Sequence, residues 1–244
     1  FFSLLRQSTA PFFAFCDQDD YWVPRKLEKL LGVMECEPLS RPTLVYSDLT
    51  IVDENLKEVF PSFMHQQHFS PGRLMIWSNN LLQNTVVGCA SMGNRELKHV
   101  VFSNPPDNWS DVIMHDWWLA IVASRFGQAI FEPTSTVLYR QHGKNQLGAK
   151  GTDFWRYLTS VINEQPIHKV KTYLDRVSVQ AAAFQQAFRD QLSIQDCELL
   201  HALANIKESR GLVRASRLLN CYGSKVRMQT SGRDLLVLLA SIVG

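Results

Sequence analysis

Residues 13–22 read FAFCDQDDYW. An apolar run that ends at Cys16 is followed by three acids, Asp17, Asp19 and Asp20, and then by two aromatic residues. A run that is apolar on both faces predicts a strand in a parallel sheet covered by helices. In open α/β sheets, ligands bind outside the carboxyl ends of the strands. We therefore expect these carboxylates to stand at a ligand-binding edge of the sheet.

Predicted strands and helices alternate on the C-terminal side of this stretch. Apolar residues at helical spacing predict a helix over 25–36, and two extended runs follow within 43–59. A strong helical pattern over 112–126 ends at Gly127. After residue 150 the pattern becomes almost entirely helical. The sequence therefore predicts an α/β part over residues 1–150 and a helical appendage over 151–244.

The composition limits the classes of function. The chain has 244 residues, 45% of them hydrophobic, which is enough for a substantial core. A formal net charge of +2 provides no strong field for nucleic acid, so we expect no nucleic-acid partner. The 5 cysteines form no CxxC pair, which argues against a zinc ribbon and fits a reducing compartment. No segment has the roughly 20 apolar residues that cross a bilayer; the apolar segment 234–244 is more simply a core element.

The three clustered acids repel one another, so a positive charge must offset them. A divalent cation is the natural candidate, because Mg²⁺ and Mn²⁺ prefer carboxylate oxygens and keep positions open for phosphate. The alternative is an acidic surface turn or a helix N-cap.

Four segments in order resemble family 2 glycosyltransferases with the GT-A fold, and more narrowly their bacterial rhamnosyltransferase-like branch. They are FAFCDQDDYWVPRKLEKL (13–30), NTVVGCASMGNREL (84–97), MHDWWLAIVAS (114–124) and LYRQHGKNQLG (138–148). The resemblance covers about residues 1–150 and implies a GT-A-like, Rossmann-like mixed sheet flanked by helices. It also implies a missing N-terminal nucleotide-binding half, so that the sheet is incomplete.

The resemblance implies a metal site in the acidic stretch. The DxD motif of the family corresponds to Asp17 and Asp19, and we expect Asp19 to contact Mg²⁺ or Mn²⁺. Asp17 would contact the donor ribose, or the metal through water, and Asp20 would lie behind them. A neutral His142 would complete the metal shell; the alternative for its segment is a basic surface loop.

Asp116 is the general base that the resemblance implies. An inverting transfer needs such a base to take a proton from the acceptor hydroxyl. A carboxylate at a helix N-terminus is expected to stay ionised at neutral pH. The simplest alternative is a helix N-cap. The neighbouring His115 suggests an HD-type phosphohydrolase, but the sequence offers no further ligand set for one.

Further residues of these segments are expected at the donor and the acceptor. Gly88 and Cys89 would allow a close approach of the backbone near the acceptor, and Trp117 would stack on a sugar ring; packing in the core is the alternative for Cys89. The segment 138–148 would contribute donors to the diphosphate of the nucleotide sugar. These donors are Arg140, Lys144 and Asn145.

The implied function is that of a metal-dependent inverting glycosyltransferase, or a fragment of one. Its donor would be a nucleotide sugar, with dTDP-rhamnose implied by the branch and UDP- or GDP-sugars as alternatives. Its acceptor would be a growing surface polysaccharide or a lipid-linked saccharide. Two alternatives remain open: a truncated, inactive relative that acts as a binding protein or is a gene remnant, and a different phosphoryl enzyme such as a nucleotidyltransferase.

The expected location is cytoplasmic. The segments RGLVRASRLL (210–219) and KVRMQ (225–229) place basic residues between apolar ones. Such a pattern is compatible with a peripheral contact on the inner face of the cytoplasmic membrane, where lipid-linked acceptors reside. Packing on the α/β part is the alternative.

Overall fold

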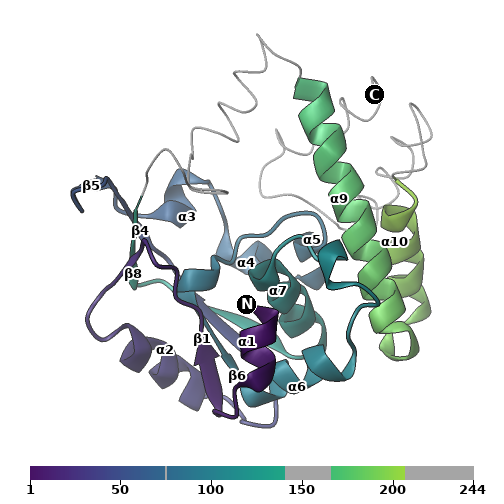
Figure 1. Ribbon diagram of the computed structural model, residues 1–244, viewed down its shortest axis with the longest axis horizontal. Helices are drawn as coiled ribbons and strands as arrows, with labels where there is room; N and C mark the ends of the chain where they lie inside the picture. Colours follow the sequence, from purple (N-terminus) through teal and green to yellow (C-terminus); the bar gives the residue numbers. More distant parts are fainter. Residues whose placement is uncertain (75, 141–165, 207–244) are drawn as a thin grey trace.

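The computed structural model describes residues 1–74, 76–140 and 166–206 and shows an α/β protein with mixed sheets flanked by helices (Figure 1). The α-helices are α1 (Phe2–Gln7), α2 (Lys26–Glu35), α3 (Phe63–Gln66), α4 (Pro71–Leu74), α5 (Trp77–Asn80), α6 (Arg95–Ser103), α7 (His115–Phe126), α9 (Pro166–Ala187) and α10 (Ile194–Ala204). The strands are β1 (Phe12–Ala14), β2 (Tyr21–Trp22), β3 (Thr43–Ser47), β4 (Thr50–Val52), β5 (Glu58–Phe60), β6 (Ser91–Asn94), β7 (Gln128–Glu132) and β8 (Val137–Arg140). The 3-10 turns are η1 (Gly88–Ala90), η2 (Trp109–Asp111) and η4 (Arg189–Gln191).

The main sheet has the strand order β1-β6-β3-β7, and core residues pack against both of its faces. Strand β3 is parallel to β7, and β6 is antiparallel to both of its neighbours. Successive side chains of β3 point to opposite faces, as strand geometry requires. Val45 packs with Leu30 and Met34 of α2 on one face, whereas Leu44 and Tyr46 belong to the core under α6 and α7 on the other.

The strand β1, which precedes the acidic stretch, differs from the strand that the sequence predicts. We expected β1 to be a buried strand of a parallel sheet, but it has three residues and lies at the end of the strand order. Among the described residues it pairs only with β6, and this pairing is antiparallel. Its apolar residues are explained by local packing: Phe13 lies directly over Gly93, where an added Cβ would come within 2.3 Å of the ring.

A second sheet, with the order β2-β8-β4-β5, carries the other end of the acidic stretch. The short strand β2 pairs antiparallel with β8, placing Tyr21 opposite Leu138 and Trp22 opposite Val137. Asp48 lies in the segment between β3 and β4. Its carboxylate accepts hydrogen bonds from the Leu49 and Met64 backbones, at 2.8 and 3.1 Å, and so holds the start of α3.

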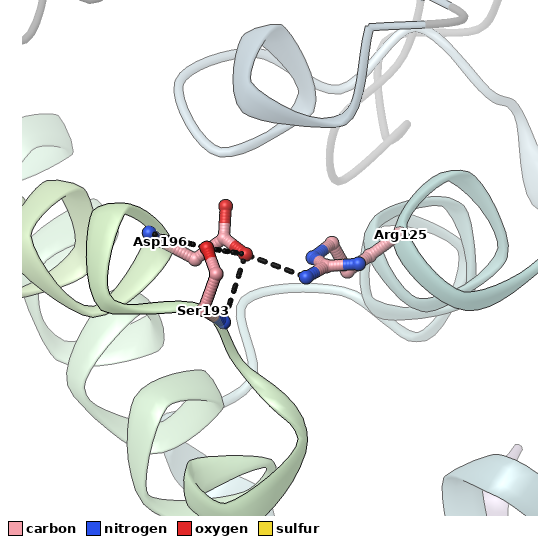
Figure 2. A network of polar contacts seen from close by, with 3 residues as sticks. All are labelled: Arg125, Ser193 and Asp196. Atoms are coloured by element: carbon pink, nitrogen blue, oxygen red, sulfur yellow. Dashed lines mark hydrogen bonds and ion pairs between the residues drawn. The ribbon is translucent and has the colours of Figure 1, made fainter.

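Helices α9 and α10 lie side by side and pack against α7 (Figure 1). Phe184 of α9 lies edge-on to Trp118 of α7, with ring centroids 5.5 Å apart. Figure 2 shows Arg125 of α7 pointing to the carboxylate of Asp196 of α10, which Ser193 also hydrogen-bonds. The Arg125 Nη2 and Asp196 Oδ2 atoms are 2.5 Å apart. Burial opposes ionisation of Asp196, but these hydrogen bonds lower its pKa below the usual value. The boundary predicted near residue 150 lies outside the described residues.

No helix within the described ranges is both long enough and apolar enough to span a bilayer. The apolar segment 234–244 and the basic segments 210–219 and 225–229 lie outside these ranges, so their proposed membrane contact stays a prediction.

Candidate functional site

Several of the site residues predicted from the sequence lie next to one another around the 3-10 turn η1. Because β1 runs antiparallel to β6, the residues that follow β1 lie beside those that precede β6. The acidic stretch is therefore placed against Gly88 and Cys89. The pairing of β2 with β8 anchors the far end of the stretch, where the backbone N–H of Arg140 donates to Asp20 Oδ1 at 3.2 Å.

Asp17, Asp20 and Cys89 form one group at this turn. A carboxylate oxygen of each acid and the Cys89 sulfur all lie within 4.8 Å of one another. Asp19, the expected metal contact, does not belong to this group, although its charge raises the pKa values of both Asp17 and Asp20. No other group of three potential metal ligands occurs in the described part of the chain, so His115 and Asp116 have no HD-type ligand set there.

The two carboxylates of this group fit a divalent cation. Two donors of one ion lie at most about 5 Å apart, since each is about 2.0–2.6 Å from the ion. Burial raises the pKa of Asp17 and of Asp20. The Oδ2 atom of Asp20 is buried and receives no hydrogen bond of normal geometry from the described residues. The Cys89 thiol, however, is not a ligand that Mg²⁺ or Mn²⁺ prefers, and burial beside Asp20 raises its pKa well above the usual value.

Lys26 also belongs to this site, although the sequence did not predict it as a site residue. Its side chain is only 2% exposed, and its Nζ donates a hydrogen bond to the Cys89 carbonyl oxygen. Nζ also lies 3.6 Å from the centroid of the Trp22 ring. In the sequence Lys26 reads as one of several polar residues of an amphipathic helix. No local pattern identifies this pair, because Trp22 belongs to strand β2 and the i, i+4 contacts of a helix do not apply between it and Lys26.

Asp116 stands on the other side of η1. It is the second residue of α7, and Met114 is the N-cap, so the N-cap interpretation of Asp116 is wrong. Its Oδ2 accepts from the Gly88 N–H at 2.9 Å, and its Oδ1 accepts from Asn84 Nδ2 at 3.1 Å and the Trp117 N–H at 2.6 Å. These donors orient the carboxylate toward the turn that also carries Cys89.

Asp116 was expected to stay ionised at neutral pH, whereas the structure indicates that it is only partly ionised there. Burial raises its pKa to about 7, which outweighs the hydrogen bonds from Gly88, Trp117 and Asn84. The charge of Asp17 contributes in the same direction and links Asp116 electrostatically to the acidic stretch. Burial also lowers the pKa of His115 to about 4, so this ring is neutral at pH 7. It stacks on Phe1, with ring centroids 3.9 Å apart.

Trp117 is placed differently from the prediction. It is 3% exposed and its Nε1 donates to the Asn80 carbonyl oxygen, so it is a core residue with no face for a sugar ring. Cys89 is likewise fully buried, beside the acids. Gly88 is closely packed by the His115 and Asp116 side chains, and its expected approach to an acceptor stays a prediction. The remaining predicted ligands, His142, Lys144 and Asn145, lie outside the described residues.

Replacing Gly88 with Ala is expected to lower the free energy of unfolding by about 1–3 kcal/mol, because the turn has no room for a side chain. The new Cβ would lie 2.8 Å from His115 Nε2 and 3.4 Å from Asp116 Oδ2. Urea unfolding measures the loss. Gly72→Ala is the matched control, since no atom lies within 4 Å of its added Cβ. Equal stability of the two variants would contradict the tight contact.

Comparisons of the chain with protein-family models, with curated proteins and with solved structures found no match.

Proposed function

We propose that the chain is a metal-dependent inverting glycosyltransferase, or a fragment of one, with the GT-A variant of the α/β fold. The observation that carries this proposal is that two acids and a general-base candidate lie on either side of the turn η1. One side of the turn faces a pair of acids suited to a cation, and the other side holds Asp116, whose pKa is near 7. A transferase of this class needs both elements: positive charge at the leaving diphosphate and a base at the acceptor.

The roles of the residues follow from this arrangement. Asp17 and Asp20 would hold Mg²⁺ or Mn²⁺, and the ion supplies Lewis-acid stabilisation of the diphosphate when bound. Asp116 would take the proton of the attacking acceptor hydroxyl. Its pKa of about 7 makes it a stronger base than an ordinary carboxylate while leaving a large fraction ionised at neutral pH. The donor sugar is proposed as rhamnose from dTDP-rhamnose, and the acceptor as a saccharide or lipid-linked saccharide.

A second candidate function is that of an inactive relative that binds a saccharide or nucleotide without transferring sugar. One observation favours it: the Asp116 side chain is 3% exposed and its carboxylate already accepts three hydrogen bonds. An acceptor hydroxyl reaches this carboxylate only if a neighbouring group moves. Binding of donor without release of nucleoside diphosphate would support this second function.

The test is a sugar-transfer assay with the full 244-residue chain. The chain is incubated with dTDP-rhamnose, a UDP-sugar or a GDP-sugar, a lipid-linked saccharide and Mn²⁺, and release of nucleoside diphosphate is measured. We expect the release to require the cation. We expect it to fall by at least about 100-fold in the double variant Asp17→Asn, Asp20→Asn, which removes both proposed anionic ligands.

The control is Glu54→Gln, which neutralises an exposed acid of the turn before β5. This variant should keep wild-type turnover. Turnover that persists in the presence of a chelator and in the double variant would contradict a metal site at Asp17 and Asp20. Release of pyrophosphate in place of nucleoside diphosphate would identify a nucleotidyltransferase.

A further inference from the structure

A buried lysine, Lys26, contacts Cys89 of the group that Asp17, Asp20 and Cys89 form. Lys26 is among the largest fully buried side chains of the described core, although lysine is almost never fully buried unless it is paired. The backbone places it there. Arg25 before it adopts a left-handed conformation, with φ at 69°, so the chain enters α2 through a sharp turn that leaves Arg25 exposed and Lys26 inside.

The ammonium group is held from two sides. The face of the Trp22 ring covers it at 3.6 Å from the ring centroid, and the Cys89 carbonyl oxygen accepts its hydrogen bond. The sulfur of the same Cys89 lies within 4.8 Å of carboxylate oxygens of both Asp17 and Asp20. Lys26 therefore adjoins the place where a divalent cation was expected to offset these acids.

The charges around Lys26 agree with this geometry. Burial lowers the pKa of Lys26 to about 8, while Cys89, Cys16, Asp20 and Asp17 act in the opposite direction. Burial and the charge of Asp19 raise the pKa of Asp17, and the positive charge of Lys26 acts in the opposite direction. Tyr139 of β8 faces the same group, and burial together with the nearby acids raises its pKa.

We propose that Lys26 is a positioning residue of this site: its ammonium is the resident counter-cation of Asp17 and Asp20 and holds the Gly88–Ala90 turn beside them. The role in sugar transfer rests on the proposed function, but the role as counter-cation does not. A positive charge held at the same turn as the two acids repels a divalent cation and so limits its affinity for them. The same turn carries the Gly88 N–H that orients Asp116, so Lys26 links the two halves of the site.

The test measures binding of Mn²⁺ alone to the full chain by titration calorimetry at pH 7. We expect Lys26→Met, which keeps the length and removes the charge, to raise Mn²⁺ affinity about tenfold or more. Lys26→Gln should act in the same direction and retains a donor for the Cys89 carbonyl. The control is Lys29→Met, an exposed lysine of the same helix, which should leave the affinity unchanged because surface charges are screened. A purely structural role of Lys26 would not raise metal affinity.

An unchanged or weaker Mn²⁺ affinity in folded Lys26→Met or Lys26→Gln, including no binding at all, would overturn the proposal. A gain that survives the addition of both Asp17→Asn and Asp20→Asn would also overturn it, because the repulsion would then act elsewhere. If neither neutral variant folds, Lys26→Arg is measured. A folded Arg variant would show that folding requires the positive charge, which supports the proposal. An unfolded Arg variant would show that folding requires the packing of the lysine side chain, which overturns it. The Mn²⁺ titration does not depend on sugar transfer. If no sugar transfer is detected, the titration still tests the role of Lys26 as counter-cation.

Discussion

Asp116→Asn is expected to lower the rate of sugar transfer by a factor of about 10²–10⁴, the usual contribution of a general base. The amide keeps the size of the carboxylate but cannot accept the proton of an acceptor hydroxyl. In the wild type, kcat/KM should rise with pH through about 7, since burial raises the pKa of Asp116 to that value. The variant should lose this dependence. Asp107→Asn, at an exposed acid in the loop before α7, is the control and should retain both rate and profile.

Asp116→Asn also tests the raised pKa of Asp116 through protein stability, without an activity assay. The folded pKa of about 7 lies above the ordinary value of 3.8. The stability that the buried neutral carboxyl contributes is therefore present below about pH 4 and is lost as the pH rises through about 7. Relative to Asp116→Asn, the wild type should lose at most about 1.4 kcal/mol of unfolding free energy per pH unit in this window.

Urea unfolding of both proteins at several pH values between 5 and 8 measures this difference. His115 has the opposite dependence, because its lowered pKa of about 4 contributes stability that is lost as the pH falls. It is present in both proteins and cancels in the comparison. Unfolding free energies that run parallel with pH would show that Asp116 has an ordinary pKa, and would remove its special suitability as a base.

Local signals predicted the helix ends and the class of the fold. Asn94 is a typical N-cap residue, and its side chain caps α6 by accepting from the Leu97 N–H at 2.9 Å. Gly127 was expected to end α7, and its N–H donates to the Ala123 carbonyl. Such caps depend on residues close in sequence, so a single sequence contains the information. The burial of Trp117 was also readable, because the residues of α7 from 117 to 123 are all apolar.

The composition of the acid group could not be predicted in the same way. Which of Asp19 and Asp20 faces Cys89 depends on how the stretch between β1 and β2 is held by β6 and β8, whose residues are distant in sequence. The offset of the acids by Lys26 depends on the left-handed backbone of Arg25, for which the sequence has no marker. Electrostatic repulsion among the acids was correctly inferred, but a neighbouring lysine relieves part of it before any metal is considered.

Gly127→Ala is expected to cause the largest loss of stability, about 3 kcal/mol or more, because its added Cβ would collide with backbone. That Cβ would lie 1.8 Å from the Pro42 carbonyl oxygen and 2.7 Å from its carbonyl carbon. Backbone atoms here cannot move freely: the Gln128 N–H donates to the same Pro42 oxygen at 2.9 Å, and Thr43 pairs with Gln128 in the sheet. The collision would therefore separate the first residues of β3 and β7.

The loss should appear as a fall in Tm of roughly 6–12 °C for a chain of this size. Gly32→Ala provides a matched control of opposite sign. Gly32 lies within α2 and has no atom within 4 Å of an added Cβ. Alanine there should raise stability by about 0.5–1 kcal/mol through its higher helix propensity. If Gly127→Ala instead melted within a degree of the wild type, the close contact between the end of α7 and Pro42 would be refuted, and with it the register that brings β7 beside β3. The same result would weaken the placement of Asp116, since α7 runs from that residue to this contact.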